Sequence, residues 1–330
     1  MLSFKIKKVL YSLIFIITLI CFVAIANYLL VPTTTMELKF EGYRNYDQNI
    51  DVLFLGNSLT GDSISKKTAD KLYGLNTFKY PHQGTNPEIL YYLLLDVSSK
   101  HKISKLICDW DIIQVFQDPP YHYPHSEELY REFLRHSYNN RKLFFLTLKN
   151  SFKQRYTSSF FKYSSFPENI TNIPAVIKSN RQHALQPNTE NNKLLAKQAL
   201  ADKENYIPKK FNNVTVETSY KNTIEKSDID YMILIKDFCN ANNIELTVVS
   251  YPLPQCVEES LSQIKDFRRI SADFFHKNGI TYFDASIIDS SQDNYKFKDA
   301  YGHIFEEYQD DFTMRLVEKI NTKKIKQVIQ

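Results

Sequence analysis

The chain has 330 residues, which is room for one large domain or two small ones and for a core that needs no disulfide support. Hydrophobic residues make up 43% of the chain, charged residues 24%, and glycine only 7 positions, which excludes a mostly disordered chain and a collagen-like or glycine-rich repeat protein. The net charge is +4, but Lys5, Lys7 and Lys8 carry most of it, and residues 1–32 contain no acid. The rest of the chain is nearly neutral, unlike the basic face that a nucleic-acid-binding protein presents.

Residues 9–31 form an uncharged, apolar run directly after these lysines. A helix of this length is about 35 Å long and can cross the hydrocarbon core of a membrane. By the positive-inside rule, residues 1–8 are expected in the cytoplasm and the chain beyond the anchor outside it. A cleaved signal peptide is the alternative, because Ala24-Ile25-Ala26 is an acceptable cleavage site. The apolar run continues through Leu30, which favours an uncleaved anchor, and both interpretations send the remaining chain across the membrane.

The four cysteines do not form a zinc-binding or disulfide-scaffold pattern. Cys21 lies in the apolar run, and the other three are far apart in the sequence. We expect buried free thiols, with a single bridge such as Cys239 to Cys256 as the open alternative. No metal and no cofactor is expected.

A polar connector over residues 32–50 leads into alternating apolar strands and amphipathic helices. Asn86 is suited to cap the second of these helices, and Pro87 to its first turn. Such alternation is typical of a parallel sheet that is covered on both faces. The predicted strands span residues 51–55, 77–80 and 103–108, and the predicted helices span residues 64–73 and 87–99.

Residues 119–226 interrupt this alternation with a segment rich in Asn, Lys, Gln, Ser and Tyr. It contains amphipathic pieces but no clear apolar strand, so we interpret it as a mostly helical insertion, a candidate cap over a site. The alternation then resumes, which predicts one α/β domain over residues 51–330 with the insertion inside it. The later predicted helices span residues 228–242, 257–277 and 305–319, and the later strands residues 244–250 and 280–283.

Three polar clusters lie where sites form in open parallel sheets, beyond the carboxyl ends of strands. In Gly56-Asn57-Ser58, a serine on a strand-to-helix turn is lifted out of the sheet, and neighbouring N–H groups can bind an oxyanion. In the second cluster Gly84 lacks a Cβ, so a substrate can approach its backbone N–H. The third contains Asp299 and His303, a pair suited to an orienting carboxylate and a general base. Each cluster alone also fits an ordinary turn.

Together, the three clusters resemble the sequence blocks of the SGNH (GDSL-like) hydrolase superfamily. Gly56-Asn57-Ser58 stands where that superfamily has Gly-Asp-Ser, Gly84 stands at its oxyanion glycine, and His303 lies in its last block. The resemblance implies a flavodoxin-like three-layer fold and acyl-ester chemistry. It also implies that Ser58 is the nucleophile, His303 the base and Asp299 the orienting acid, with the N–H groups of Ser58 and Gly84 as oxyanion donors.

The chain departs from the superfamily pattern at three points. Residue 57 is Asn rather than Asp, and the third block reads Cys108-Asp109-Trp110-Asp111 where Gly-x-Asn-Asp is usual. A third oxyanion donor is therefore missing or supplied by another residue, such as Asn86. Asp299 precedes His303 by four residues rather than three, which leaves Asp284 as a substitute acid, although a structural turn acid is the favoured interpretation of that position.

With the predicted anchor, the chain resembles extracytoplasmic SGNH-like proteins that modify surface glycopolymers, including polysaccharide O-acetyltransferases and the lipoteichoic acid D-alanylation protein. This resemblance implies an anchored transferase that moves acyl groups, with acetyl expected, to a surface glycan or glycolipid through a serine acyl-enzyme. It also implies a multi-spanning membrane acyltransferase as the partner that supplies acyl groups. Two alternatives stay open: an esterase or deacetylase of the same fold, and a catalytically degenerate scaffold in glycan assembly.

Overall fold

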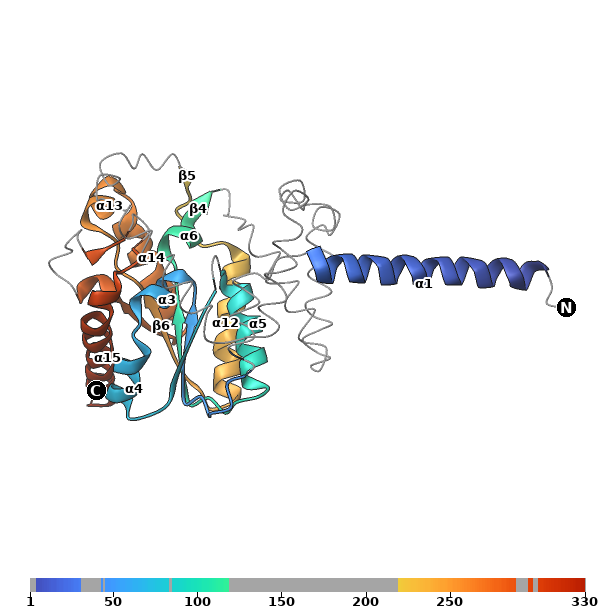
Figure 1. Cartoon of the computed structure of the whole chain (residues 1–330). Coiled ribbons are helices and arrows are strands. Elements are labelled where there is room, and N and C mark those ends of the chain that lie inside the picture. The colour runs from blue at the N-terminus through green and yellow to red at the C-terminus, as the bar shows by residue number, and fades with distance from the viewer. Residues whose placement is uncertain are drawn as a thin grey trace. The chain divides into compact units, whose positions relative to one another are not determined.

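The computed structural model describes residues 4–30, 43, 45–82, 85–118, 219–288, 296–298 and 302–329. The chain divides into two compact units, one formed by residues 1–42 and 155–202 and the other by residues 43–154 and 203–330. In the first unit, the described element is the helix α1 (Phe4–Leu30) (Figure 1). Within the described residues, no helix has both the length and the apolar character needed to span a membrane.

The second unit is built on a five-stranded sheet in which every strand runs parallel to its neighbours. The strand order is β2-β1-β3-β6-β7, which becomes 2-1-3-4-5 when only the strands of this sheet are numbered. This is the flavodoxin-like order, so the predicted α/β fold with a parallel sheet is confirmed. The strands are β1 (Val52–Gly56), β2 (Thr77–Pro81), β3 (Lys105–Asp109), β6 (Glu245–Ser250) and β7 (Thr281–Asp284).

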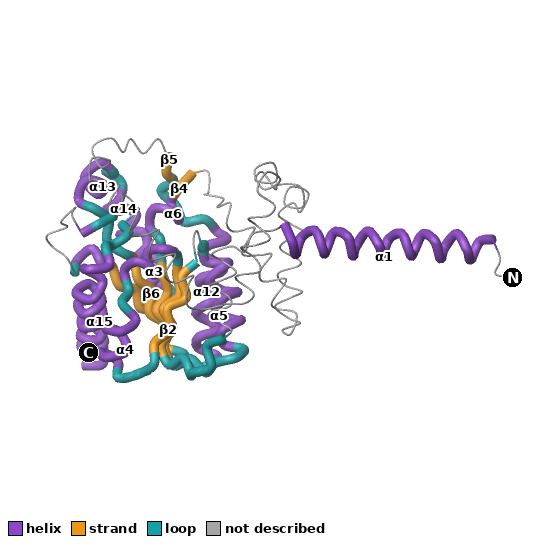
Figure 2. Tube along the Cα trace, in the orientation of Figure 1, coloured by secondary structure: helices purple, strands orange, loops and turns teal. Residues whose placement is uncertain are grey.

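Helices cover both faces of this sheet and make three layers. Helices α5 and α12 pack together on one face, and α4 and α15 pack together on the other (Figures 1 and 2). The main helices are α3 (Ser58–Ser63), α4 (Lys66–Tyr73), α5 (Pro87–Ser98), α12 (Lys226–Ala241), α14 (Ile264–Lys277) and α15 (Glu306–Ile329). Shorter helices are α6 (Ile112–Phe116), α13 (Gln255–Ser260) and the 3₁₀ turn η2 (Ala285–Ile287).

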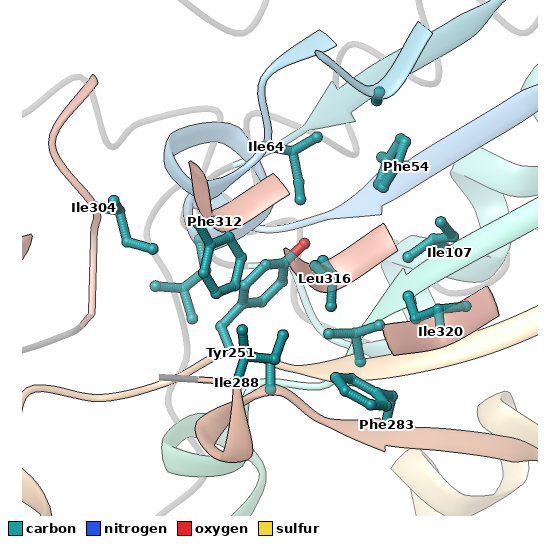
Figure 3. Packing of buried hydrophobic residues seen from close by; sticks show 14 of the residues in the cluster. Phe54, Ile64, Ile107, Tyr251, Phe283, Ile288, Ile304, Phe312, Leu316 and Ile320 are labelled. Carbon is teal, nitrogen blue, oxygen red and sulfur yellow. The ribbon is translucent and has the colours of Figure 1, made fainter. Parts of the chain in front are cut away.

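Alternate residues of the strands point toward α15 and form a hydrophobic cluster with it. Figure 3 shows this cluster, in which strand residues meet side chains of α15. Each fully buried large side chain of this kind contributes about 1.5–3 kcal/mol. The same cluster includes Leu59 and Ile304, the chain neighbours of Ser58 and His303. The labelled members are Phe54, Ile64, Ile107, Tyr251, Phe283, Ile288, Ile304, Phe312, Leu316 and Ile320.

The helix boundaries differ from the predicted ones in three places. A separate short helix, α3, precedes α4, because the side chain of Ser65 caps α4 by accepting from the Thr68 N–H. The predicted helix over residues 257–277 is divided into α13 and α14. Helix α15 runs to Ile329, beyond the predicted end, since no glycine or proline interrupts the sequence after its first turn.

The short strands β4 (Gln117–Asp118) and β5 (Ser219–Tyr220) belong to the second unit and pair antiparallel in a separate two-stranded sheet. A strand inside the predicted insertion was not expected, because two residues are too few to show an alternating pattern. Residues 119–218, with the predicted helical cap, lie outside the described residues.

The cysteines that the structure describes are free thiols, as predicted. Cys108 and Cys239 are buried, and Cys21 is exposed. Burial raises the pKa of Cys239 to about 12 and raises the pKa of Cys108 well above its ordinary value. The alternative bridge from Cys239 to Cys256 is therefore wrong.

Candidate active site

Ser58 occupies the strand-to-helix turn that the sequence predicts. Strand β1 ends at Gly56, and Asn57 caps α3 by accepting from the Leu59 N–H at 2.7 Å through Oδ1. Ser58 is the first residue of α3 and only half-buried, whereas Leu59 is buried in the core. The first N–H groups of a helix have no partner within it, so the N–H of Ser58 is placed to serve an oxyanion.

Gly56 is required because this turn lies close to the end of β3. A Cβ on Gly56 would lie 2.0 Å from Thr60 Oγ1 and 2.5 Å from Asp109 Cβ. The Gly56 carbonyl accepts from the His82 N–H at 2.9 Å, which ties the end of β1 to the segment after β2. The backbone beneath Ser58 is therefore fixed from both neighbouring strands.

His303 lies in a segment that is held at both ends and tied to α3. Phe297 and Ile304 form an antiparallel bridge, and the Lys298 N–H donates to the His303 carbonyl at 2.6 Å. The Lys298 ammonium pairs with Asp62 of α3 at 3.2 Å. Because Ile304 is buried, the backbone of His303 is anchored to the same core as that of Ser58.

Ser58 and His303 are 245 residues apart in the sequence and in contact in the structure. His303 Nε2 lies 2.7 Å from Ser58 Oγ. This distance is within the hydrogen-bonding range of about 2.6–3.2 Å expected for a nucleophile and its general base. The imidazole can therefore take the hydroxyl proton as the serine oxygen attacks an electrophile.

Gly302 sets the direction of His303, and Gly302→Ala should weaken the Ser58–His303 contact. Its φ of +94° is strained for alanine, and a Cβ there would lie 2.6 Å from the Pro252 carbonyl oxygen. Since misplacement by about 1 Å costs roughly 10²-fold in rate, we expect a loss of about 10–100-fold in turnover of an aryl ester. Gly279→Ala is the matched control, because Gly279 has a φ of +65° and open space around it. Equal activity of the two variants would contradict this role of Gly302.

Two carboxyl groups at the end of β3 bind the Asn57 backbone and side chain. The Asn57 N–H donates to Asp109 Oδ2 at 3.2 Å, and Asn57 Nδ2 donates to Asp111 Oδ2 at 2.7 Å. The other oxygen of Asp111 caps α6 by accepting from the Ile113 and Gln114 N–H groups at 3.0 and 3.1 Å. No role for Asp111 was expected from the sequence. The signal that could have revealed one is an aspartate directly before a short apolar run, which is typical of a helix cap.

The two carboxyl groups differ in environment. Burial raises the pKa of Asp109 well above its ordinary value, and the like charge of Asp111 raises it further. Burial raises the pKa of Asp111 as well, although the α6 N–H groups, the charge of His303 and the Asn57 amide offset part of this rise. Of this pair, Asp111 is therefore the group that ionises more readily.

Asp109→Asn should stabilise the protein at neutral pH. Because the folded state holds the Asp109 proton more tightly than the unfolded state, this group's contribution to stability is largest in acid and is lost as the pH rises toward the folded pKa. An amide has no proton to lose, so the melting temperature of Asp109→Asn should exceed that of the wild type by a few degrees at about pH 7.5. The difference should shrink toward about pH 4. If the difference in melting temperature between Asp109→Asn and the wild type instead widened in acid, Asp109 would be ionised in the folded protein.

The other predicted site residues are placed as follows. Gly84 and Asp299 lie outside the described residues, so their roles stay predictions. Asn86 caps α5 by accepting from the Ile89 N–H at 3.0 Å, and its role as an oxyanion donor is also untested. Asp284 caps η2 and pairs with Arg268, which agrees with its interpretation as a structural turn acid, and its role as a substitute acid is untested. The described residues contain no cluster of three or more His, Cys, Asp or Glu side chains that could hold a metal ion.

No family model matches this sequence, and none of the curated proteins compared with it matches either. Among solved structures, a protein of Bacteroides fragilis described as an acylhydrolase matches with 9% identity and a TM-score of 0.41, over 88% of this chain and 98% of its own. A GDSL-like lipase of Bacteroides thetaiotaomicron matches with 9% identity and a TM-score of 0.40, over the same shares.

Proposed function

We propose that the second unit catalyses acyl-ester chemistry with Ser58 as nucleophile and His303 as general base. The observation that supports this most directly is the 2.7 Å separation of Ser58 Oγ and His303 Nε2. Ser58 Oγ would attack the carbonyl carbon of the ester while His303 takes the hydroxyl proton. The imidazolium would return this proton to the leaving alcohol, which leaves the acyl group on Ser58. A second hydroxyl, activated by the same imidazole, would then take the acyl group.

The proposal includes an oxyanion site and an orienting acid. The N–H of Ser58 lies at the first position of α3, where a helix leaves such groups unbonded. Gly84 is the second donor that the superfamily resemblance suggests, Asn86 is the candidate replacement for the donor that the third block lacks, and Asp299 is the acid that would orient the His303 ring. The assignments of Gly84 and Asp299 rest on the resemblance.

We further propose an acyltransferase, with acetyl the expected group, whose acceptor is a surface glycan or glycolipid. The support is the resemblance of the sequence to anchored SGNH-like proteins. Two further observations support the proposal: the uncharged run over residues 9–31, and the exposed large apolar side chains of α1 between Ile6 and Phe22. In this proposal residues 1–8 are cytoplasmic, α1 anchors the chain, and the site works outside the membrane. A multi-spanning acyltransferase would supply the acyl groups.

The proposal is tested with the full-length protein, an aryl acetate as donor and a panel of oligosaccharides as acceptors. A transferase should release the phenol faster with acceptor present and should form an acetylated sugar that mass spectrometry detects. Release of phenol and acetate without any acetylated sugar would favour the esterase alternative. No release above that of Ser58→Ala would contradict acyl-ester chemistry altogether and favour the scaffold alternative.

A further inference from the structure

The turn that carries Ser58 is fastened to the end of the neighbouring strand by a side-chain contact. Strands β1 and β3 pair with Leu55 opposite Cys108, so the residues that follow each strand meet at the same edge of the sheet. There Asn57 Nδ2 donates to Asp111 Oδ2 at 2.7 Å, while Asn57 Oδ1 caps α3. The Asn57 amide thus connects Asp111 to the first turn of α3, where Ser58 lies.

Asp111 is bound in the manner of an ionised carboxylate. Its two oxygens accept three hydrogen bonds, two from N–H groups at the start of α6 and one from Asn57. Carboxylates are acceptors only, and three donors favour the charged form. The neighbouring acid, Asp109, has its pKa raised well above the ordinary value by burial.

Asp111 and His303 also interact through their charges. The charge of His303 lowers the pKa of Asp111. By thermodynamic reciprocity, a negative charge on Asp111 must favour the protonated imidazole of His303 by the same free energy. That protonated ring is the species that forms when His303 takes the Ser58 proton.

We propose that Asp111 is a positioning residue for the Ser58–His303 pair, because it holds Asn57, and with it the first turn of α3, against the end of β3. The inference deepens the proposed function and rests on it for its catalytic consequence. Among the described residues, Asp111 forms hydrogen bonds with Asn57 and the α6 N–H groups and interacts electrostatically with Asp109 and His303. Asp111 itself forms no bond with the substrate in this account.

The amide and the carboxylate can be exchanged, which provides a matched test in the full-length protein. One oxygen of each side chain caps a helix, so Asp111→Asn turns an NH₂ group toward the Asn57 NH₂, and Asn57→Asp turns a carboxylate oxygen toward that of Asp111. Neither pair can form the hydrogen bond, so each variant should lower kcat for an aryl acetate by about tenfold. In the double variant Asn57→Asp with Asp111→Asn, the hydrogen bond is restored with its direction reversed. Its kcat should therefore return to within about threefold of the wild type. A double variant no better than either single variant, with all three folded, would overturn the proposal.

A second readout does not depend on turnover. In full-length protein labelled with ¹⁵N-histidine, the His303 ring is assigned by its loss in His303→Gln, and its titration is followed by NMR. Asp111→Asn should move the titration midpoint of this ring to lower pH by about half a unit. Asp237→Asn, an exposed charge change on α12, is the control and should leave the midpoint in place. An unchanged midpoint in Asp111→Asn overturns the inference, whereas a shifted midpoint in a protein without esterase activity counts against the proposed function alone.

Discussion

Ser58→Ala and His303→Ala should each lower the hydrolysis of an aryl acetate by at least about 10³-fold while the protein stays folded. The reason is their direct contact: Ser58 Oγ supplies the nucleophile, and His303 Nε2, 2.7 Å away, accepts its proton. Neither side chain is fully buried, so truncation should leave the core around Leu59 and Ile304 intact. Steady-state kinetics on the full-length protein, together with circular dichroism melts, measure both effects.

The rate of the double variant shows whether Ser58 and His303 act as one catalytic pair or contribute to catalysis independently. If the residues act as a unit, the double variant Ser58→Ala with His303→Ala should be about as slow as either single variant. His276→Ala, on α14 outside the site, serves as a control for loss of an imidazole. If the fold loss in rate of the double variant equalled the product of the two single losses, the shared proton transfer would be contradicted.

Gly56→Ala should destabilise the second unit by about 3 kcal/mol. The added methyl would meet Thr60 Oγ1 at 2.0 Å and Asp109 Cβ at 2.5 Å, and both neighbours belong to packed elements that cannot move apart easily. The same displacement would carry Ser58 away from His303, because Ser58 follows closely along the same turn. We expect a fall in melting temperature of roughly 5–10 °C together with a large loss of esterase activity.

Gly74→Ala is the control for this substitution. Gly74 follows α4 with a φ of +62° and has no atom near its missing Cβ. Alanine there should cost only the strain of the left-handed backbone, about 1 kcal/mol, and should leave activity intact. If Gly56→Ala were no worse than Gly74→Ala, the close approach of β1 and β3 at the site would be wrong.

The sheet could be predicted from the sequence because its strands are short apolar runs that end in polar turns. Residues 51–55, for example, predict a buried strand, and β1 covers Val52–Gly56 with every residue buried. Chain order and the strand-helix alternation then place the ends of the strands at one edge, which is why the sequence alone predicts that Ser58 and His303 lie together. Their contact itself depends on Gly302 and the bridge of Phe297 to Ile304, which no local pattern reveals.

The supporting residues of the site were harder to predict. Asp111 lies beyond the regular part of β3, and its role depends on the pairing of β1 with β3, which brings Asn57 within reach. Asp284, by contrast, follows a predicted strand, where the sequence favours a structural turn acid, and its cap on η2 and its ion pair with Arg268 agree with that interpretation. Side chains that act through a partner from a distant segment leave little trace in the local sequence.

The central claim is that Ser58 is an activated nucleophile, and covalent labelling tests it most directly. The full-length protein is treated with a fluorophosphonate, digested and mapped by mass spectrometry, with His303→Ala treated in parallel. The account predicts one phosphonylated site, Ser58, with labelling slowed by about 10²-fold or more when His303 is replaced. Folded protein in which Ser58 stays unlabelled, or is labelled equally fast without the His303 imidazole, would contradict it.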